Sequence, residues 1–462
     1  MTTARIAAAP DPSNTVDSVP PPARLFALGL QHVLVMYAGS VAVPMIIGGA
    51  LKLPKEDIAF LISADLFCCG LVTLIQSVGI FNVGIRLPIM MGIAFTAIAP
   101  IISTGTNPAL GIGAVFGAVI GSGVFAYLAA PYMSRLVRWF PPVVTGTLIL
   151  VIGLSLLRVG INWAAGGQPM LFRPGGPVPN PDYGLPLHLA IAGLVLLIVV
   201  LVTAFGRGFL ANVAVLVGMG AGFVASIALG QVSFAGVEAA PWVSLVLPFH
   251  FGLPSFDAMS TLTLSLIMVV MMIESTGLFL AAADITGRPI DSADIARGLR
   301  ADGLGNVIGG IFGTFCYTSY SQNVGLLQVT NVRSRWVVAM AAGVLVVLGC
   351  LPKLSLVVAS VPQYVLGGAA IVMFGMVAAT GVKILGEVEF TRDRANLYIV
   401  SISVVLGLTP LLADRFFSQL PPVLARFMQN GTLLCALSAV VLNLLFHRGR
   451  AHERREPAVQ RT

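Results

Sequence analysis

Long apolar segments alternate with short polar ones from about residue 25 to residue 447 of the chain. An apolar helix needs about 20 residues to cross the hydrocarbon core of a bilayer, so each long segment is a candidate membrane span. On this criterion we expect about fourteen spans. Their ranges are 25–50, 57–81, 86–104, 110–132, 140–160, 186–205, 209–231, 259–283, 294–312, 321–333, 335–357, 363–384, 395–413 and 429–447. The pattern therefore predicts an all-α polytopic membrane protein.

Two of these segments, 86–104 and 321–333, are too short or too interrupted to cross as regular helices. In the stretch Thr314–Asn331, residues 318–323 are polar and an apolar run starts at Val324. Backbone that is not helical is tolerated at membrane depth only where it lines a cavity or is buried in protein. We therefore expect a broken helix here, with the N-terminus of its second half pointing into a binding site.

Composition supports this interpretation. Only 10% of the 462 residues are charged, against about 25% in a typical soluble domain, whereas 50 residues are Gly and 29 are Pro. Such a balance agrees with closely packed and broken transmembrane helices. The net charge of +7 does not indicate a nucleic-acid partner, because no basic run adjoins a group of aromatic residues. The five cysteines lie in apolar segments without metal-ligand spacing, so we interpret them as small buried hydrophobic residues and expect neither a metal nor another cofactor.

The placement of positive charges predicts the orientation. If both termini are cytoplasmic, most Lys and Arg residues fall in the inside loops, as expected for an even number of spans. We therefore expect a multi-pass protein of the inner (cytoplasmic) membrane with both termini cytoplasmic. Residues 1–24 are rich in Pro, Ala and Ser and are expected to form a disordered N-terminal segment, and residues 448–462 a short cytoplasmic tail.

A weak internal repeat divides the chain. Four residues recur 221 positions later, namely Pro141, Val144, Gly146 and Gly160 as Pro362, Val365, Gly367 and Gly381. We interpret residues 25–231 and 259–447 as two repeats of seven spans, joined by a linker at 232–258. Because each repeat has an odd number of spans, the second copy must be inverted. Inverted repeats with broken helices at the midplane are a transporter architecture.

Ionisable groups inside spans are costly, so they are candidates for function. Glu274 has long apolar flanks on both sides, and its carboxyl group must be protonated, paired or hydrogen-bonded. We expect it to accept N–H groups of a substrate and to follow proton occupancy. Asp302 is a second candidate, as a proton-relay group or an acceptor for a helix end, and His32 either fills a core position or holds the geometry of the site. Asp65 and Asp284 lie near span ends, where we expect water to reach them, and we favour a structural role for both.

The polar stretch adds Ser321, Gln322 and Asn323 to the candidate site. A side-chain amide offers two N–H donors and one carbonyl acceptor. A Gln beside a Glu suits a planar ligand whose edge alternates C=O and N–H groups, because the amide both donates and accepts while the carboxylate accepts. A helix that begins at this point adds backbone donors and the positive end of its dipole. The alternative is that the amides only link two helices.

These residues make the chain resemble the nucleobase–ascorbate transporter family over about residues 25–447. The family motif Gln/Glu/Pro-Asn-x-Gly-x4-Thr is similar to residues 322–330, which include Gln322, Asn323, Gly325 and Thr330. Three further motifs are matched by the pair Gln31-His32, by Glu274 in Glu-Ser-Thr-Gly and by Asp302 in Ala-Asp-Gly, and Ala94-Phe95 matches the third-span segment that faces the substrate in relatives.

Two positions depart from the family pattern. Asn331 stands where relatives have Arg, Lys or Gly, at a position associated with selectivity, which leaves the substrate preference open. Leu278 stands four residues after Glu274, where many relatives have Asp or His, so a second polar ligand from that helix turn is in doubt.

The resemblance implies a fold and a set of roles. Spans 1–4 and 8–11 would form a core domain, spans 5–7 and 12–14 a gate domain, and the third and tenth spans would each combine a short strand with a half-helix. Relatives move the core against the gate, and several are homodimers through the gate, so a homodimer is expected here. The residues expected at the substrate are Glu274, Gln322, Phe95, Asn323, Ala94 and Ser321. Those expected to support the site and proton coupling are Asp302, His32, Gln31, Gly325 and Thr330.

The expected function is uptake of an oxidised purine nucleobase, xanthine or urate, driven by protons. Gln322 favours the purine branch, since uracil carriers of the family tend to have Glu there, and the small Ala94 leaves room for urate. The residues do not distinguish xanthine from urate, or protons from sodium ions. A uracil or other nucleobase symporter is one alternative, and an anion exchanger or channel of the same architecture is another. An integral membrane enzyme is disfavoured, because the chain has no His/Cys/Asp cluster with metal spacing, no Gly-x-Ser-x-Gly motif and no phosphate-binding loop.

Overall fold

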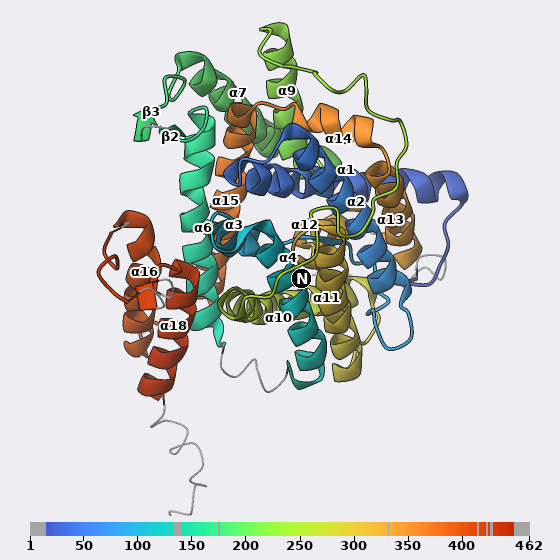
Figure 1. Ribbon diagram of the computed structural model, residues 1–462. Coiled ribbons are helices and arrows are strands. Elements are labelled where there is room, and N and C mark those ends of the chain that lie inside the picture. The colour runs from blue at the N-terminus through green and yellow to red at the C-terminus, as the bar shows by residue number, and fades with distance from the viewer. Residues whose placement is uncertain are drawn as a thin grey trace, which may run out of the picture.

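The computed structural model describes residues 15–133, 140–173, 176–330, 332–413, 415–421, 424–425 and 428–447, and these residues are mostly helical (Figure 1). Among them, eight helices are long and apolar enough to cross a membrane. They are α1 (Pro22–Ala50), α2 (Lys55–Val78), α4 (Gly111–Ala129, continued to Tyr132), α6 (Pro142–Ala164), α7 (Pro186–Phe205), α10 (Ala258–Thr286), α15 (Gln363–Leu385) and α16 (Ala395–Leu412). The expectation of a helical polytopic membrane protein is confirmed.

The remaining helices are shorter or more polar. They are α3 (Ile98–Gly105), α8 (Phe209–Asn212), α9 (Ala214–Ala228), α11 (Ser292–Phe312), α12 (Ser321–Thr330), α13 (Arg335–Gly349), α14 (Pro352–Ala359) and α18 (Gly431–His447), with the 3-10 turns η1 (Phe95–Ala97) and η2 (Ala130–Tyr132). A small hairpin of β2 (Met170–Arg173) and β3 (Gly176–Pro179) lies in the long loop after α6.

The helices pack in two groups. In the first group α13 packs on α1 and α2, while α4 packs on α10 and α11. In the second group α15 packs on α6, α7 and α9, and α16 and α18 pack on each other and on α6. The groups meet where α9 touches α1, α8 touches α12, and α3 and η1 touch α6. Figure 1 shows the second group as α6, α15, α16 and α18 on one side and α7 and α9 above.

The repeated residues lie at corresponding places in α6 and α15. Pro141 and Pro362 directly precede the two helices. A Cβ atom added at Gly146 would lie 3.1 Å from the carbonyl oxygen of Gly381, and one added at Gly381 would lie 2.8 Å from that of Gly146. A side chain at either position would force the helices apart, so the repeated glycines permit this close contact.

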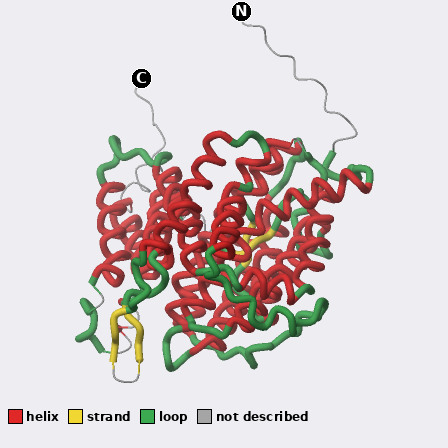
Figure 2. The backbone as a smooth tube through the Cα atoms, turned by 90° about the horizontal axis from the view of Figure 1, so that it is seen from above, coloured by secondary structure: helices red, strands yellow, loops and turns green. Residues whose placement is uncertain are grey.

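Two short strands meet in the interior, where they cross in Figure 2. Strand β1 (Met91–Ile93) pairs antiparallel with β4 (Tyr317–Ser319), with Gly92 opposite Thr318. The N–H of Ala94 donates to the carbonyl of Cys316 at 2.8 Å, and that of Tyr320 donates to Met90 at 2.9 Å, which extends the pairing at both ends. Helix α12 follows β4 directly, and η1 and α3 follow β1. The two interrupted segments therefore each contain a short strand and a helix, and both helices begin beside the same strand pair.

Two expected continuous spans are broken. The segment expected at 335–357 bends by 80° between α13 and α14. Pro352 begins α14, and proline lacks the N–H that would continue the preceding helix, so this break had a visible signal. The segment expected at 209–231 is interrupted at Val213, where the backbone leaves helical geometry. No proline or glycine marks this second break.

The N-terminal segment also differs from the expectation of disorder. Its residues 15–21 are ordered against the start of α13, because Val16 is buried and Asp17 forms an ion pair with Arg335 at 2.7 Å. The N–H of Arg335 donates to the carbonyl of Val16 at 2.9 Å. Residues 1–14 and the tail 448–462 lie outside the described residues.

Candidate functional site

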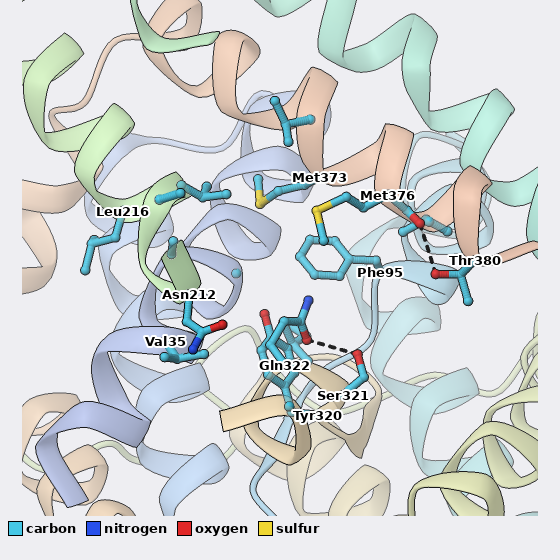
Figure 3. Close-up of a pocket in the computed structure, with 18 of the residues that line it drawn as sticks. Val35, Phe95, Asn212, Leu216, Tyr320, Ser321, Gln322, Met373, Met376 and Thr380 are labelled. Carbon is cyan, nitrogen blue, oxygen red and sulfur yellow. Dashed lines mark hydrogen bonds between the residues drawn. The ribbon is translucent and has the colours of Figure 1, made fainter. Parts of the chain in front are cut away.

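A cavity of about 400 Å³ lies between the two helix groups (Figure 3). One wall comes from α1, η1, α10 and the junction of β4 with α12, and the facing wall comes from α7, α8, α9 and α15. Its volume falls within the range of about 300–1,000 Å³ that is typical of small-molecule sites. Of the expected site residues, the cavity is lined by Glu274, Gln322, Phe95, Ala94, Ser321 and Gly325.

Glu274 enters the cavity from α10. Its neighbour Ser275 holds this turn of α10 against β4, since the hydroxyl oxygens of Ser275 and Thr318 lie 3.1 Å apart. The N–H of Ser319 points to the same Ser275 hydroxyl at 3.5 Å. Among the described residues Glu274 has no hydrogen bond or ion pair of its own, although it lies in an apolar setting. Its carboxyl oxygens are therefore available to N–H groups of a ligand.

Gln322 lies in the first turn of α12, where the half-helix faces the cavity. The hydroxyl of Ser321 donates to Oε1 of Gln322 at 3.1 Å (Figure 3). This contact engages the amide oxygen and leaves the two N–H donors of Nε2 for the cavity. One edge of the site thus offers amide donors from α12 and carboxyl acceptors from α10.

Phe95 and Ala94 approach from the third segment. The strand contact between Ala94 and Cys316 fixes the backbone at this point. The ring of Phe95 packs edge-on against Phe374 of α15, with centroids 6.4 Å apart and planes at 77°. The ring thus borders the cavity beside Met376 (Figure 3). An aromatic ring at this place can pack against the face of a planar ligand.

Asn323 and His32 lie behind the cavity rather than in it. Both side chains are buried, and Nδ2 of Asn323 is 3.0 Å from Nδ1 of His32 and donates to the His32 carbonyl at 3.1 Å. The expected place of Asn323 beside the ligand is therefore corrected, because its amide faces α1. The contacts of His32 with Asn323 agree with the geometry-holding role, which stays one of its two interpretations.

Asp302 is fully buried in α11 and is bound to α2. Nε2 of Gln76 donates to Oδ1 of Asp302 at 3.3 Å, and Oε1 of Gln76 accepts the N–H of Ile85 at 3.0 Å. Among the described residues Oδ2 of Asp302 has no hydrogen-bond partner. Asp302 does not line the cavity, so its contacts fit support of the site.

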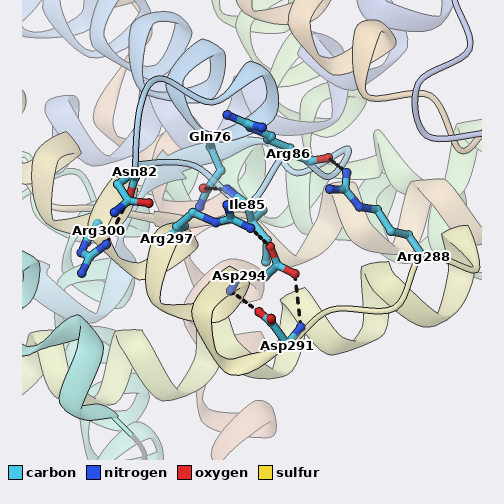
Figure 4. Close-up of polar contacts among 9 residues, drawn as sticks. All are labelled: Gln76, Asn82, Ile85, Arg86, Arg288, Asp291, Asp294, Arg297 and Arg300. Atoms are coloured by element: carbon cyan, nitrogen blue, oxygen red, sulfur yellow. Dashed lines mark hydrogen bonds and ion pairs between the residues drawn. The ribbon is translucent and has the colours of Figure 1, made fainter.

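A further group of polar contacts joins the loop after α2 to the junction of α10 and α11 (Figure 4). A guanidinium nitrogen of Arg288 donates to the carbonyl of Arg86 at 2.8 Å. Asp291 caps α11 by accepting the N–H of Asp294, whose carboxylate pairs with Arg297. These contacts fix the ends of the helices that carry Glu274 and Asp302.

The other expected site residues have local roles or lie apart. Thr330 donates to the carbonyl of Leu326 within its own helix at 2.8 Å. Gln31, half-buried on α1, and Leu278, half-buried on α10, do not line the cavity. Asn331 lies outside the described residues, so its departure from the family pattern has no structural account here.

Asp65 and Asp284 differ from each other. Asp284 is exposed, as expected for a residue near the end of a span. Asp65 is fully buried, which contradicts the expectation that water reaches it. Its Oδ1 accepts the hydroxyl of Tyr317 at 2.8 Å and that of Thr314 at 3.5 Å. The Asp65 side chain faces β4, and the sequence of the segment alone could not predict which neighbouring element it faces.

Tyr320, Gly39 and Asn212 are three of the cavity residues that were not singled out in the sequence. Tyr320 belongs to the polar stretch, and its ring packs against Gly39 of α1 and Gly92 of β1. Gly39 itself had no signal in the sequence. Asn212 is an amide inside an apolar segment, and this contrast could have identified it.

Comparison with known proteins gives close relatives along nearly the whole chain. A sequence model described as a permease family matches residues 23–415. The uric acid transporter UacT of Escherichia coli (strain K12) is 50% identical over 442 residues, covering 96% of this chain and 90% of that protein. The uric acid permease PucJ and the xanthine permease of Bacillus subtilis (strain 168) are each 39% identical, covering 92% of this chain and 92% and 94% of those proteins.

Solved structures with the same fold are more distant in sequence. The transmembrane domain of the cyanobacterial bicarbonate transporter BicA has a TM-score of 0.53 at 17% identity, covering 93% of this chain and 99% of that chain. The murine anion transporter Slc26a9, in an inward-facing state, has a TM-score of 0.60 at 13% identity, covering 93% and 69%. At this identity the likeness shows the fold alone.

Proposed function

The chain belongs to the nucleobase–ascorbate transporter family of permeases, and from this premise we propose that it imports an oxidised purine, xanthine or urate, together with protons. It is a permease and not an enzyme. The relatives named above as uric acid and xanthine transporters support this substrate class. The observation that carries the proposal is the pairing of Glu274 with Gln322 in one cavity.

The chemistry of the two side chains suits an oxidised purine. The six-membered ring of xanthine or urate presents ring N–H groups between carbonyl oxygens. Nε2 of Gln322 donates to a carbonyl, and the Glu274 carboxyl accepts a neighbouring N–H. Phe95 packs on the ring face, and the N-terminus of α12 favours the partial negative charge of the carbonyl oxygens. Ser321 supports this arrangement by holding the Gln322 amide.

Proton coupling follows from the setting of Glu274. A carboxylate with no cation or donor beside it is costly in an apolar cavity, whereas a protonated carboxyl group or one bound to substrate N–H groups is not. A protonated Glu274 keeps a carbonyl oxygen that accepts a substrate N–H, so proton and substrate bind together at this residue, with Asp302 as a second buried carboxyl group behind it. Apart from the coupling proton, the proposal involves no metal or cofactor.

Transport follows from relative motion of the two helix groups. We assign α1–α4 and α10–α14 to a core domain and α6–α9 with α15, α16 and α18 to a gate domain, which corresponds to fourteen spans in two inverted sevens. The cavity is bordered by Thr203 and Thr380, near the ends of α7 and α15 that the distribution of Lys and Arg places in the cytoplasm. The structure is therefore assigned to an inward-facing state, with both termini cytoplasmic in the inner membrane. The exposed apolar surface of the gate suits lipid and a second copy of the chain in a homodimer.

An anion exchanger is the second candidate, because the similar solved structures include bicarbonate and anion transporters. Glu274 argues against it, since an inorganic anion such as sulfate has no N–H group for this carboxyl group to accept. The test is a thermal-shift and uptake-competition panel with xanthine, urate, guanine, hypoxanthine, uracil and sulfate. Stabilisation and competition by xanthine or urate support the proposal. Competition by sulfate without purines, or by uracil alone, would overturn it.

A further inference from the structure

Asn212 is a polar residue on the facing wall of the cavity that the proposed site does not use. It ends the short helix α8, at the break between α7 and α9. Helix α8 contacts α12, and the adjacent Val213 packs with Val35 of α1 and Leu326 of α12 in a small hydrophobic cluster. The break and this cluster place the Asn212 side chain at the cavity, with its oxygen directed toward Gln322 and its nitrogen toward Val35 (Figure 3).

The amide of Asn212 lacks a partner. Its Nδ2 atom is buried, and among the described residues it has no hydrogen-bond acceptor. Leaving a buried donor unsatisfied costs about 1–3 kcal/mol, so a rotation of the side-chain amide that brings Nδ2 to a ligand acceptor in the cavity is favoured. The other polar side chains of this wall are the hydroxyls of Thr203 and Thr380, and that of Thr380 already donates to the carbonyl of Met376 at 3.0 Å.

We propose that Asn212 hydrogen-bonds the five-membered ring of the substrate and selects purines that are oxidised at C8. In urate this ring carries C8=O next to N–H groups, which forms a cyclic amide edge. A side-chain amide pairs with such an edge through two hydrogen bonds, because Nδ2 donates to the oxygen while Oδ1 accepts the N–H. Xanthine carries only C–H at C8, so it cannot form this pair.

This inference rests on the proposed function and makes it more specific. With the six-membered ring held by Gln322 and Glu274, the five-membered ring extends toward the facing wall, where Asn212 is the amide available. A site that hydrogen-bonds one substrate disfavours an analogue without that group, since its polar atoms then stay unpaired. Urate is therefore the preferred substrate over xanthine. Asn212 also contacts the ligand from the gate domain, so it binds fully only when the two groups are placed as in this structure.

The test compares uptake of labelled urate and labelled xanthine by cells that express the wild type or the variant Asn212→Leu, which keeps the size of the side chain and removes its polar atoms. The ratio of kcat/KM for urate to that for xanthine should fall roughly tenfold or more, with xanthine uptake nearly unchanged. The matched control Asn443→Leu lies on α18 outside the cavity and should leave the ratio unchanged. If Asn212→Leu does not reach the membrane, Asn212→Ser takes its place, with the same expected direction.

An equal loss for both purines would assign Asn212 to packing or gating and overturn the inference, as would an unchanged ratio. Both results would leave the proposed function intact. If the wild type takes up neither purine, the proposed function itself fails. Thermal shifts of the purified variants with urate and xanthine provide a second reading that does not depend on transport.

Discussion

Asn323 on the half-helix α12 donates a hydrogen bond from Nδ2 to Nδ1 of His32 on α1, at 3.0 Å, and a second one to the His32 carbonyl at 3.1 Å. The two contacts join one side chain of α12 to both a ring atom and a backbone atom of α1. The pair ties the half-helix that carries Gln322 to the neighbouring helix. Asn323 thus fixes the position of the neighbouring Gln322 through contacts on the side of α12 that faces away from the cavity.

Replacing Asn323 tests this link. Asn323→Ala leaves the buried Nδ1 of His32 without its Asn323 partner, which costs about 1–3 kcal/mol. We expect a lower Tm and a strongly reduced uptake of purine, measured by thermal unfolding in detergent and by uptake in cells. Asn443→Ala is the matched control and should change neither. A normal Tm together with normal uptake in Asn323→Ala would contradict the positioning role.

Gly39 tests the packing around Tyr320. A Cβ atom at Gly39 would collide with the hydroxyl of Tyr320, whose ring also packs closely over Gly92. Overpacking of this kind typically costs about 1–3 kcal/mol. Gly39→Ala should therefore displace Tyr320 and lower the affinity for purine about tenfold, as measured by ligand-induced thermal shift. Gly343→Ala on α13 has open space around it and serves as the control. Equal affinities of the two variants would show that Tyr320 does not shape the site.

Variants of Asp65 test whether its buried carboxyl group has a structural role or a role in transport. It is fully buried and accepts the Tyr317 and Thr314 hydroxyls, so it holds β4 and lies outside the cavity. Asp65→Asn keeps an oxygen acceptor and should retain most of the stability and uptake. Asp65→Leu removes the acceptor and leaves the Tyr317 hydroxyl unsatisfied, so its Tm should fall clearly below that of Asp65→Asn. If Asp65→Asn folds but no longer transports, Asp65 has a role in coupling.

The sequence predicted most of the elements, because long apolar runs, the polar stretch 318–323 and the repeated glycines are local patterns. It also predicted the cavity residues Glu274 and Gln322, whereas Phe95 was expected only from the family resemblance. Local patterns could not show which way a buried polar residue turns. Asn323 faces His32, and Asp65 faces Tyr317, because packing of distant helices decides both directions. The contribution of Asn212 depends on a break at Val213 that has no sequence signal we recognise.

Gln322→Glu tests the division of donors and acceptors. The change removes the Nε2 donors and places a second carboxyl group in the cavity with Glu274, where like charges disfavour ionisation of both. We expect uptake of xanthine and urate to fall at least tenfold, about 1.4 kcal/mol. Gln322→Asn retains the amide on a shorter side chain and should be impaired less. Normal purine uptake by Gln322→Glu would show that the Nε2 donors of Gln322 do not hydrogen-bond the ligand.

The central claim is proton-driven purine transport through Glu274. The direct measurement is accumulation of labelled urate and xanthine in membrane vesicles with an imposed inward proton gradient, with and without a protonophore, for the wild type and Glu274→Gln. We predict that the wild type accumulates purine, that the protonophore abolishes this accumulation, and that Glu274→Gln does not accumulate purine under either condition. Accumulation by the wild type that is unaffected by the protonophore, or normal gradient-driven accumulation by Glu274→Gln, would contradict the account.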